Sequence, residues 1–167
     1  MSGVWGFLFQ SLVAGVFATF VMDLGATLGA KAGLLVKPNP ALLTRWLVRT
    51  VTTRKLTAPQ PIFAEKPIQN EAQIGVAIHY AIGVLLAAVY FALLLKTGYE
   101  GGFWSAVAYG LSTNVFPWLM MFPSMGLGFF GSKAPPQAKL FRTSLVNHID
   151  YGLGLFLASV VLRHFRL

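Results

Sequence analysis

The sequence predicts an all-α membrane protein, a bundle of four transmembrane helices formed by one domain of residues 1–167. Of these residues, 56% are hydrophobic and 11% are charged, whereas soluble domains average about 45 to 50% apolar and about 25% charged residues. Four segments stay apolar over the roughly 20 residues with which a helix crosses about 30 Å of hydrocarbon. None of them alternates strictly between apolar and polar residues, as barrel strands do.

The first predicted span covers residues about 4–30 and contains Gln10 and Asp23 as its strongly polar residues. The connection that follows, residues 31–73, begins with an amphipathic segment, residues 41–52. We expect this segment to form a helix in the cytoplasmic membrane interface. Its apolar face would carry Leu42, Leu43, Trp46, Leu47 and Val51, with Arg45 and Arg49 on another face. The Pro-rich stretch 58–67 cannot continue that helix.

The remaining predicted spans cover residues about 74–95, 103–122 and 145–162. Before the last of them, residues 123–131 are apolar yet rich in glycine and proline. Irregular backbone is tolerated at membrane depth only where protein or a water-filled cavity covers it. We therefore expect a re-entrant or interfacial loop before the last helix.

The distribution of charge predicts the orientation and the partners of the chain. The connections 31–73 and 123–144 carry ten Lys or Arg residues, and the opposite side carries three. Because cytoplasmic loops are enriched in Lys and Arg, both termini are expected to face away from the cytoplasm. The basic residues lie between apolar runs and form no patch with interleaved aromatics, so the lipid bilayer is the expected partner and nucleic acid is not. The absence of cysteine excludes disulfides and thiolate chemistry.

Polar side chains inside the predicted spans indicate a site, because such groups are costly in hydrocarbon and usually face the interior of a bundle. With a rise of about 1.5 Å per residue, all four helices bring a polar group roughly 5 to 12 Å below the cytoplasmic boundary. Glu71 lies at the mouth, where it can also favour the helix dipole. His148 and Asp150 point to opposite faces of one helix, so a single site cannot easily use both. The candidates are Asp23, Glu71, His79, Tyr80, Asn114, His148 and Asp150.

These residues favour binding and transport of a small solute or ion at an Asp/His cluster, with Asp23 as proton acceptor. Four helices enclose little space, so a homo-oligomer is expected. One alternative is a membrane-embedded enzyme in which Asp23, His79 and His148 hold a catalytic metal. Another is an accessory subunit whose small-residue stripes dock a larger membrane complex. The same polar residues can also act only as hydrogen-bonded packing residues, and the sequence identifies no cofactor.

Several motifs, in order along the chain, resemble the pattern of a bacterial family catalogued as domain of unknown function 2938. They are Met22-Asp23, Glu71 followed by His79-Tyr80 and Gly83, Thr113 with Pro117, Pro123 with Gly126-x-Gly128, and Ser144-Leu145-x-x-His148-x-x-x-Gly152-x-Gly154-Leu155. The resemblance covers residues about 17–157 and implies a small multi-pass protein of the bacterial inner membrane, with no established activity. The chain departs from the family pattern at Asn70 and Gln73, where glycine and an apolar residue are expected.

Overall fold

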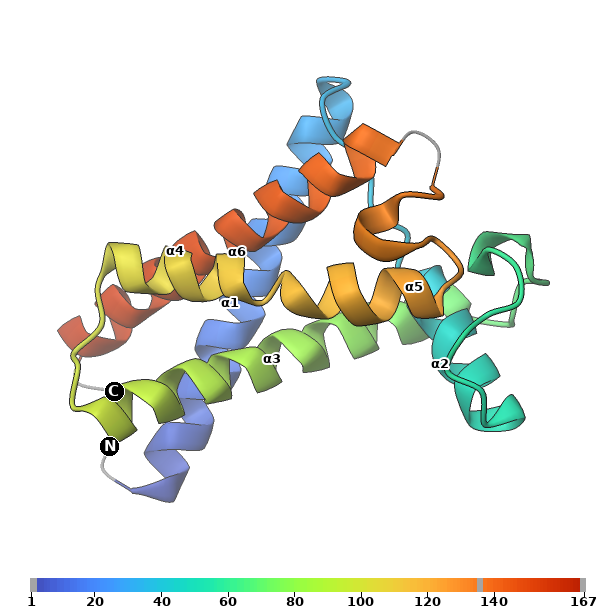
Figure 1. The fold of residues 1–167 in the computed structure, drawn as a ribbon. Helices are drawn as coiled ribbons and strands as arrows, with labels where there is room; N and C mark the ends of the chain where they lie inside the picture. Colours follow the sequence, from blue (N-terminus) through green and yellow to red (C-terminus); the bar gives the residue numbers. More distant parts are fainter. Residues whose placement is uncertain (1–2, 135–136, 166–167) are drawn as a thin grey trace. The chain divides into compact units, whose positions relative to one another are not determined.

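The computed structural model describes residues 3–134 and 137–165, and every regular element of these residues is a helix. The all-α class is therefore confirmed. Figure 1 shows the helices in chain order. They are α1 (Val4–Lys31), α2 (Ala41–Thr53), α3 (Glu71–Thr97), α4 (Phe103–Ser112), α5 (Phe122–Ser124) and α6 (Gln137–His164). Short helical turns lie between them: η1 (Ile62–Ala64), the π-helical η2 (Pro117–Met121) and η3 (Phe129–Gly131).

Three helices of the described residues, not four, are long and apolar enough to cross a membrane. They are α1, α3 and the Lys139–His164 part of α6. The predicted third span, residues 103–122, is not a continuous helix, so the prediction of four spanning helices is supported for three of them. Its first piece, α4, has ten residues, which is about 15 Å of helix and half of the hydrocarbon thickness.

Pro117 explains why this segment is interrupted. A proline has no backbone N–H to donate to the carbonyl four residues earlier, which here belongs to Thr113. That carbonyl accepts instead from the N–H of Phe116, at 3.2 Å, in a tighter turn. After the proline the turn widens, because the N–H of Phe122 donates to the Pro117 carbonyl in η2. Proline and its neighbours thus replace regular α-helix with one tight and one wide turn.

The chain forms two compact units, which are described separately. Unit 1 consists of Met1–Gly25, Tyr80–Ser112 and Val146–Leu167, and unit 2 of Ala26–His79 and Thr113–Leu145. The sequence of unit 1 contains three basic and three acidic residues, whereas that of unit 2 contains ten basic and two acidic residues. The whole formal net charge of +8 therefore belongs to unit 2.

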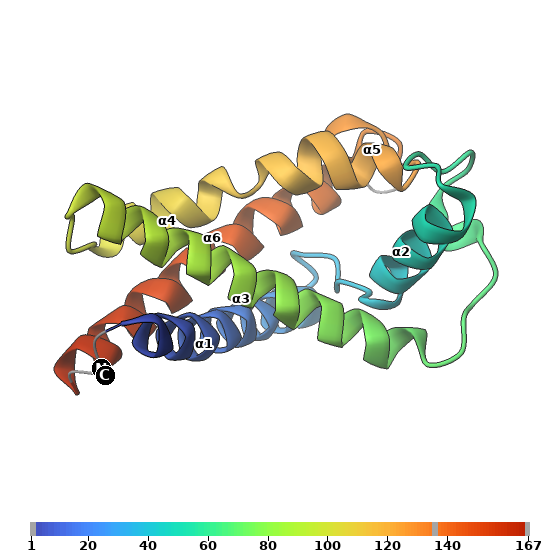
Figure 2. The same cartoon turned by 90° about the horizontal axis from the view of Figure 1, so that it is seen from below.

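Small residues bring the helices of unit 1 into close contact. Gly15 of α1 lies against the backbone of Val84 in α3. A Cβ on Gly152 of α6 would lie 2.6 Å from the Ala106 carbonyl oxygen of α4, and α4 runs alongside α6 in both views (Figures 1 and 2). In a membrane the hydrophobic effect does not drive helices together, so small residues that let their backbones approach closely stabilise the contact. Tyr151 of α6 is buried between these helices, and its hydroxyl donates to the Gly83 carbonyl of α3 at 2.6 Å.

One end of unit 1 collects the start of α1, the connection between α3 and α4, and the end of α6. Val4, Gly98 and Arg163 line one cavity of about 800 Å³ there. The Arg163 guanidinium also donates to the backbone carbonyl of Glu100 at 2.5 Å. The first turn of α1 and the last turn of α6 therefore lie at the same end of this unit.

Unit 2 is built around α2, which covers the predicted amphipathic segment. Three apolar side chains of α2, those of Leu42, Leu43 and Trp46, pack on a second core made by Ile62, Met125, Leu127 and Ala134. Val51 remains 68% exposed, so part of the apolar face stays available to a membrane. The Pro-rich stretch covers the apolar loop: Ala58 N–H donates to the Ser124 carbonyl at 2.7 Å, and Ile62 N–H to the Met125 carbonyl at 2.9 Å.

Candidate functional site

The seven predicted site residues divide between the two units. Unit 1 holds the Asp23 of α1, the Tyr80 of α3, and the His148 and Asp150 of α6. Unit 2 holds Glu71, His79 and Asn114. Asn114 is fully buried, and the other six are partly exposed.

Asp23 and Tyr80 come together in unit 1. The Tyr80 hydroxyl hydrogen-bonds to the Asp23 carboxylate, and both groups interact electrostatically. The contact joins α1 to α3, two of the three candidate membrane spans. An ionisable side chain inside a span is rare and is by default a candidate for a pathway or binding residue. The structure thus gives the predicted Asp23 a specific partner, one that the sequence had placed at nearly the same depth.

A second carboxylate of unit 1 belongs to Asp150 and lies against α1. A Cβ on Gly25 would collide with Asp150 Oδ2, so only a glycine leaves room for the carboxylate at that position. Asp150 also shares a helix face with Asn147, three residues earlier. Asn147 is 8% exposed, and among the described residues its Oδ1 atom has no hydrogen-bond partner.

The sequence did not single out Asn147 as a candidate, although its spacing from Asp150 was a signal. A buried polar atom without a partner costs free energy in a low-dielectric interior. Asn147 therefore adds a buried acceptor to the α6 face that carries Asp150.

His148 lies on α6 where this helix meets α4. Its backbone carbonyl approaches Gly110 so closely that a Cβ on Gly110 would collide with it. The same Gly110 faces Gly152, one turn further along α6. This turn of α6 thus packs on α4 with its backbone, while Asp150 reaches α1.

Glu71 of unit 2 is held by a partner that the sequence did not identify. Arg45 Nε donates to Glu71 Oε2 at 2.7 Å and Arg45 Nη2 to Oε1 at 2.5 Å, and the N–H of Ile68 donates to Oε2 at 2.8 Å. The two side chains are 11% and 14% exposed. Hydrogen bonding to Glu71 raises the already high pKa of Arg45. Bidentate pairs of this kind are strong and geometrically specific.

Arg49, one helical turn after Arg45, makes a second ion pair, with Glu65 at 3.0 Å. The two arginines therefore bind the 54–71 connection to α2. The sequence pattern placed both arginines on the polar face of an amphipathic helix. Such a pattern cannot distinguish an arginine in solvent from one in an ion pair.

Asn114 ties the interrupted segment to α6. Its Oδ1 accepts a hydrogen bond from Ser144 Oγ at 2.7 Å, and the contact is buried. His79 also belongs to unit 2, where it is half-buried on α3. Among the described residues, no three or more His, Asp or Glu side chains are grouped so that they could hold a metal ion.

Two glycines of the small-residue stripes, Gly83 and Gly154, make contacts within unit 1. Gly83 lies against Thr19, and a Cβ on Gly154 would lie 2.6 Å from the Ala18 Cα. These positions serve contacts between helices of the same chain.

A family model described as "Protein of unknown function (DUF2938)" matches residues 12–162. The match extends on both sides of the residues, about 17–157, that carry the resemblance seen in the sequence. Comparisons with curated proteins and with solved structures gave no match.

Proposed function

Since the chain belongs to the DUF2938 family of proteins of unknown function, we propose a function from its own site. The protein is an integral membrane protein that binds, and moves, a small cation or a proton at the membrane-embedded carboxylate of Asp23. The observation that carries the proposal is the contact between Asp23 of α1 and Tyr80 of α3, because it connects two candidate membrane spans through an ionisable group.

The chemistry of the site favours a positive ligand. An ionised carboxylate only accepts hydrogen bonds, and in a low-dielectric setting it attracts cations or takes up a proton. Asp150 supplies a second carboxylate to the same unit, and the Asn147 Oδ1 atom supplies a further acceptor. Two acids and an amide oxygen would repel an anion.

The charge of the two units supports an orientation for this activity. Unit 2 carries the whole net charge of +8, so by the enrichment of cytoplasmic loops in Lys and Arg it would face the cytoplasm. The first turn of α1 and the last turn of α6, which share one end of unit 1, would face the periplasm of a bacterial inner membrane. Because so few helices enclose little space, we expect the active form to be a homo-oligomer.

The proposal is tested by reconstituting the purified protein into liposomes and following internal pH with a trapped dye under an imposed proton or potassium gradient. Asp23→Asn keeps the shape of the side chain and removes its charge. A hydrogen bond to a charged group contributes about 1.5 to 3 kcal/mol, so this variant should lower the flux about tenfold or more. Tyr80→Phe should lower it less. Glu100→Gln, which removes an exposed acid between α3 and α4, is the matched control and should leave it unchanged.

If Asp23→Asn elutes as the wild-type protein does and still carries the full flux, Asp23 is a packing residue and the proposal fails. An equal loss in Glu100→Gln would also contradict it, since the effect would then follow from net charge and not from this site.

A further inference from the structure

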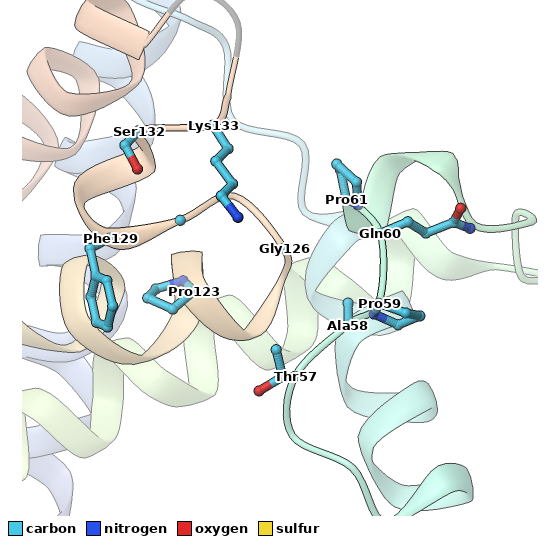
Figure 3. Close-up of a pocket in the computed structure, with 11 residues that line it drawn as sticks. Thr57, Ala58, Pro59, Gln60, Pro61, Pro123, Gly126, Phe129, Ser132 and Lys133 are labelled. Carbon is cyan, nitrogen blue, oxygen red and sulfur yellow. The ribbon is translucent and has the colours of Figure 1, made fainter.

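A pocket in unit 2 lies between the two irregular segments of the chain (Figure 3). One wall comes from the Pro-rich stretch before η1 and the other from the apolar loop before α6, and the pocket has a volume of about 400 Å³. Its position is fixed by the hydrogen bonds from Ala58 to Ser124 and from Ile62 to Met125. Lining residues that matter for the argument are Thr57, Pro61, Pro123, Phe129, Ser132 and Lys133.

The composition of the two walls explains why the pocket is not filled. Three of its lining residues are prolines and two are the glycines Gly126 and Gly128. A Cβ on Gly126 would lie 2.7 Å from the Gln60 carbonyl oxygen, so any side chain there would push the walls apart. Gly126 also has a φ of +76°, which glycine adopts readily. Gly126 therefore lets the two segments come into backbone contact beside the pocket.

The chemistry of the pocket is that of an anion site with an apolar side. Lys133 is the single charged residue among the described residues that line it. Its amine reaches into the space between the two segments (Figure 3). Ser132 and Thr57 are polar residues on the same lining, while Phe129, which is 60% exposed, and the proline rings are apolar. A lysine amine suits a phosphate group, and the apolar side suits the remainder of an amphiphile.

The surroundings favour the same ligand. Unit 2 carries the whole net charge of +8, and basic segments beside a membrane attract anionic lipids. Val51 of α2 and Phe129 leave apolar surface exposed in this unit. We propose that this pocket binds the phosphate group of an anionic phospholipid, with Lys133 as the residue that contacts the phosphate. This site is independent of Asp23 and of the function proposed above.

The test is a titration of the detergent-purified full chain with dihexanoyl phosphatidylglycerol, read by native mass spectrometry as ligands retained per protomer. One tightly bound lipid is expected. Lys133→Gln should weaken its binding about tenfold or more, since a hydrogen bond to a charged group is lost. Lys133→Arg should bind within a few-fold of wild type. The control Lys139→Gln removes the same charge from another exposed lysine of unit 2 and should keep the bound lipid.

Two further arms identify the source of the phosphate. Dihexanoyl phosphatidylcholine, which has a phosphate but no net charge, should bind more weakly. Inorganic phosphate should compete only at concentrations far above those of the lipid. Inorganic phosphate that binds as tightly as the lipid would overturn the phospholipid assignment. Equal weakening by Lys133→Gln and Lys139→Gln would overturn the site itself, because it would reflect attraction to the whole basic surface.

Discussion

Asn70, the residue just before α3, has a left-handed backbone with a φ of +57°. The family resemblance led us to expect glycine at this position, and glycine adopts such a conformation without a steric penalty. Asparagine is among the few other residues that tolerate it. Asn70 therefore adopts a backbone conformation that glycine would also allow, and the N–H of Ile74 donates to the Asn70 carbonyl at 3.1 Å.

The effect of a substitution at Asn70 on stability should depend on the backbone conformation that the new residue allows. The side chain itself should matter little, because it is exposed. Asn70→Gly should raise stability by roughly 0.5 kcal/mol, and Asn70→Ala should lower it by about 1 kcal/mol, since a left-handed residue with a Cβ is strained. The measurement is the thermal unfolding midpoint in one detergent. A destabilised Asn70→Gly together with an unaffected Asn70→Ala would show that the amide group, and not the φ angle, matters here.

Depth along a helix predicts only that polar residues lie at similar levels, not which of them meet. Asp23 and Tyr80 were both expected in the cytoplasmic half of the spans, and they are in contact. The pairing of Glu71 with Arg45 was not foreseen, since it depends on how the 54–70 connection folds back on α2. Hydrophobic periodicity contains no information about that path.

Among the elements, the segment from α4 to α5 shows that an apolar composition does not by itself predict a continuous helix. Residues 103–122 are as apolar as a span needs to be, yet α4 ends at Ser112. Average hydropathy contains no information on backbone hydrogen bonds. Pro117 cannot donate to the Thr113 carbonyl, which accepts from the N–H of Phe116 instead. Buried Asn114, which lies in the interrupted segment, accepts a hydrogen bond from Ser144 of α6.

The contact between α4 and α6 depends on a glycine at the crossing point. Gly152→Ala would place a Cβ 2.6 Å from the Ala106 carbonyl oxygen and 2.8 Å from the Val107 Cα, and backbone cannot move aside as a side chain can. Overpacking of this kind costs about 1 to 3 kcal/mol. We expect a lower thermal midpoint for Gly152→Ala.

The matched control for that substitution is Gly102→Ala. Its Cβ would meet nothing closer than the Tyr99 hydroxyl at 3.6 Å, an ordinary contact, so its midpoint should stay near that of wild type. If both variants unfold at the same temperature, the close approach of α4 and α6 does not exist in the folded protein.

At the scale of the whole molecule, charge and fold divide the chain in the same way. The ten basic residues that the sequence assigns to one side of the membrane are the ten that the structure places in unit 2. Assigning all ten to one side of the membrane requires residues 103–122 to cross it, although they do not form one continuous helix.

The division of charge predicts which connections face which side. Because the chain has no cysteine, a single introduced thiol reports its position without background. Glu100→Cys, between α3 and α4 in unit 1, should react with a membrane-impermeant maleimide on intact spheroplasts. Lys55→Cys, in the connection between α2 and α3 in unit 2, should react only after permeabilisation; both positions are exposed. The reverse pattern would invert the orientation, and labelling of both from the same side would mean that α3 does not cross the membrane.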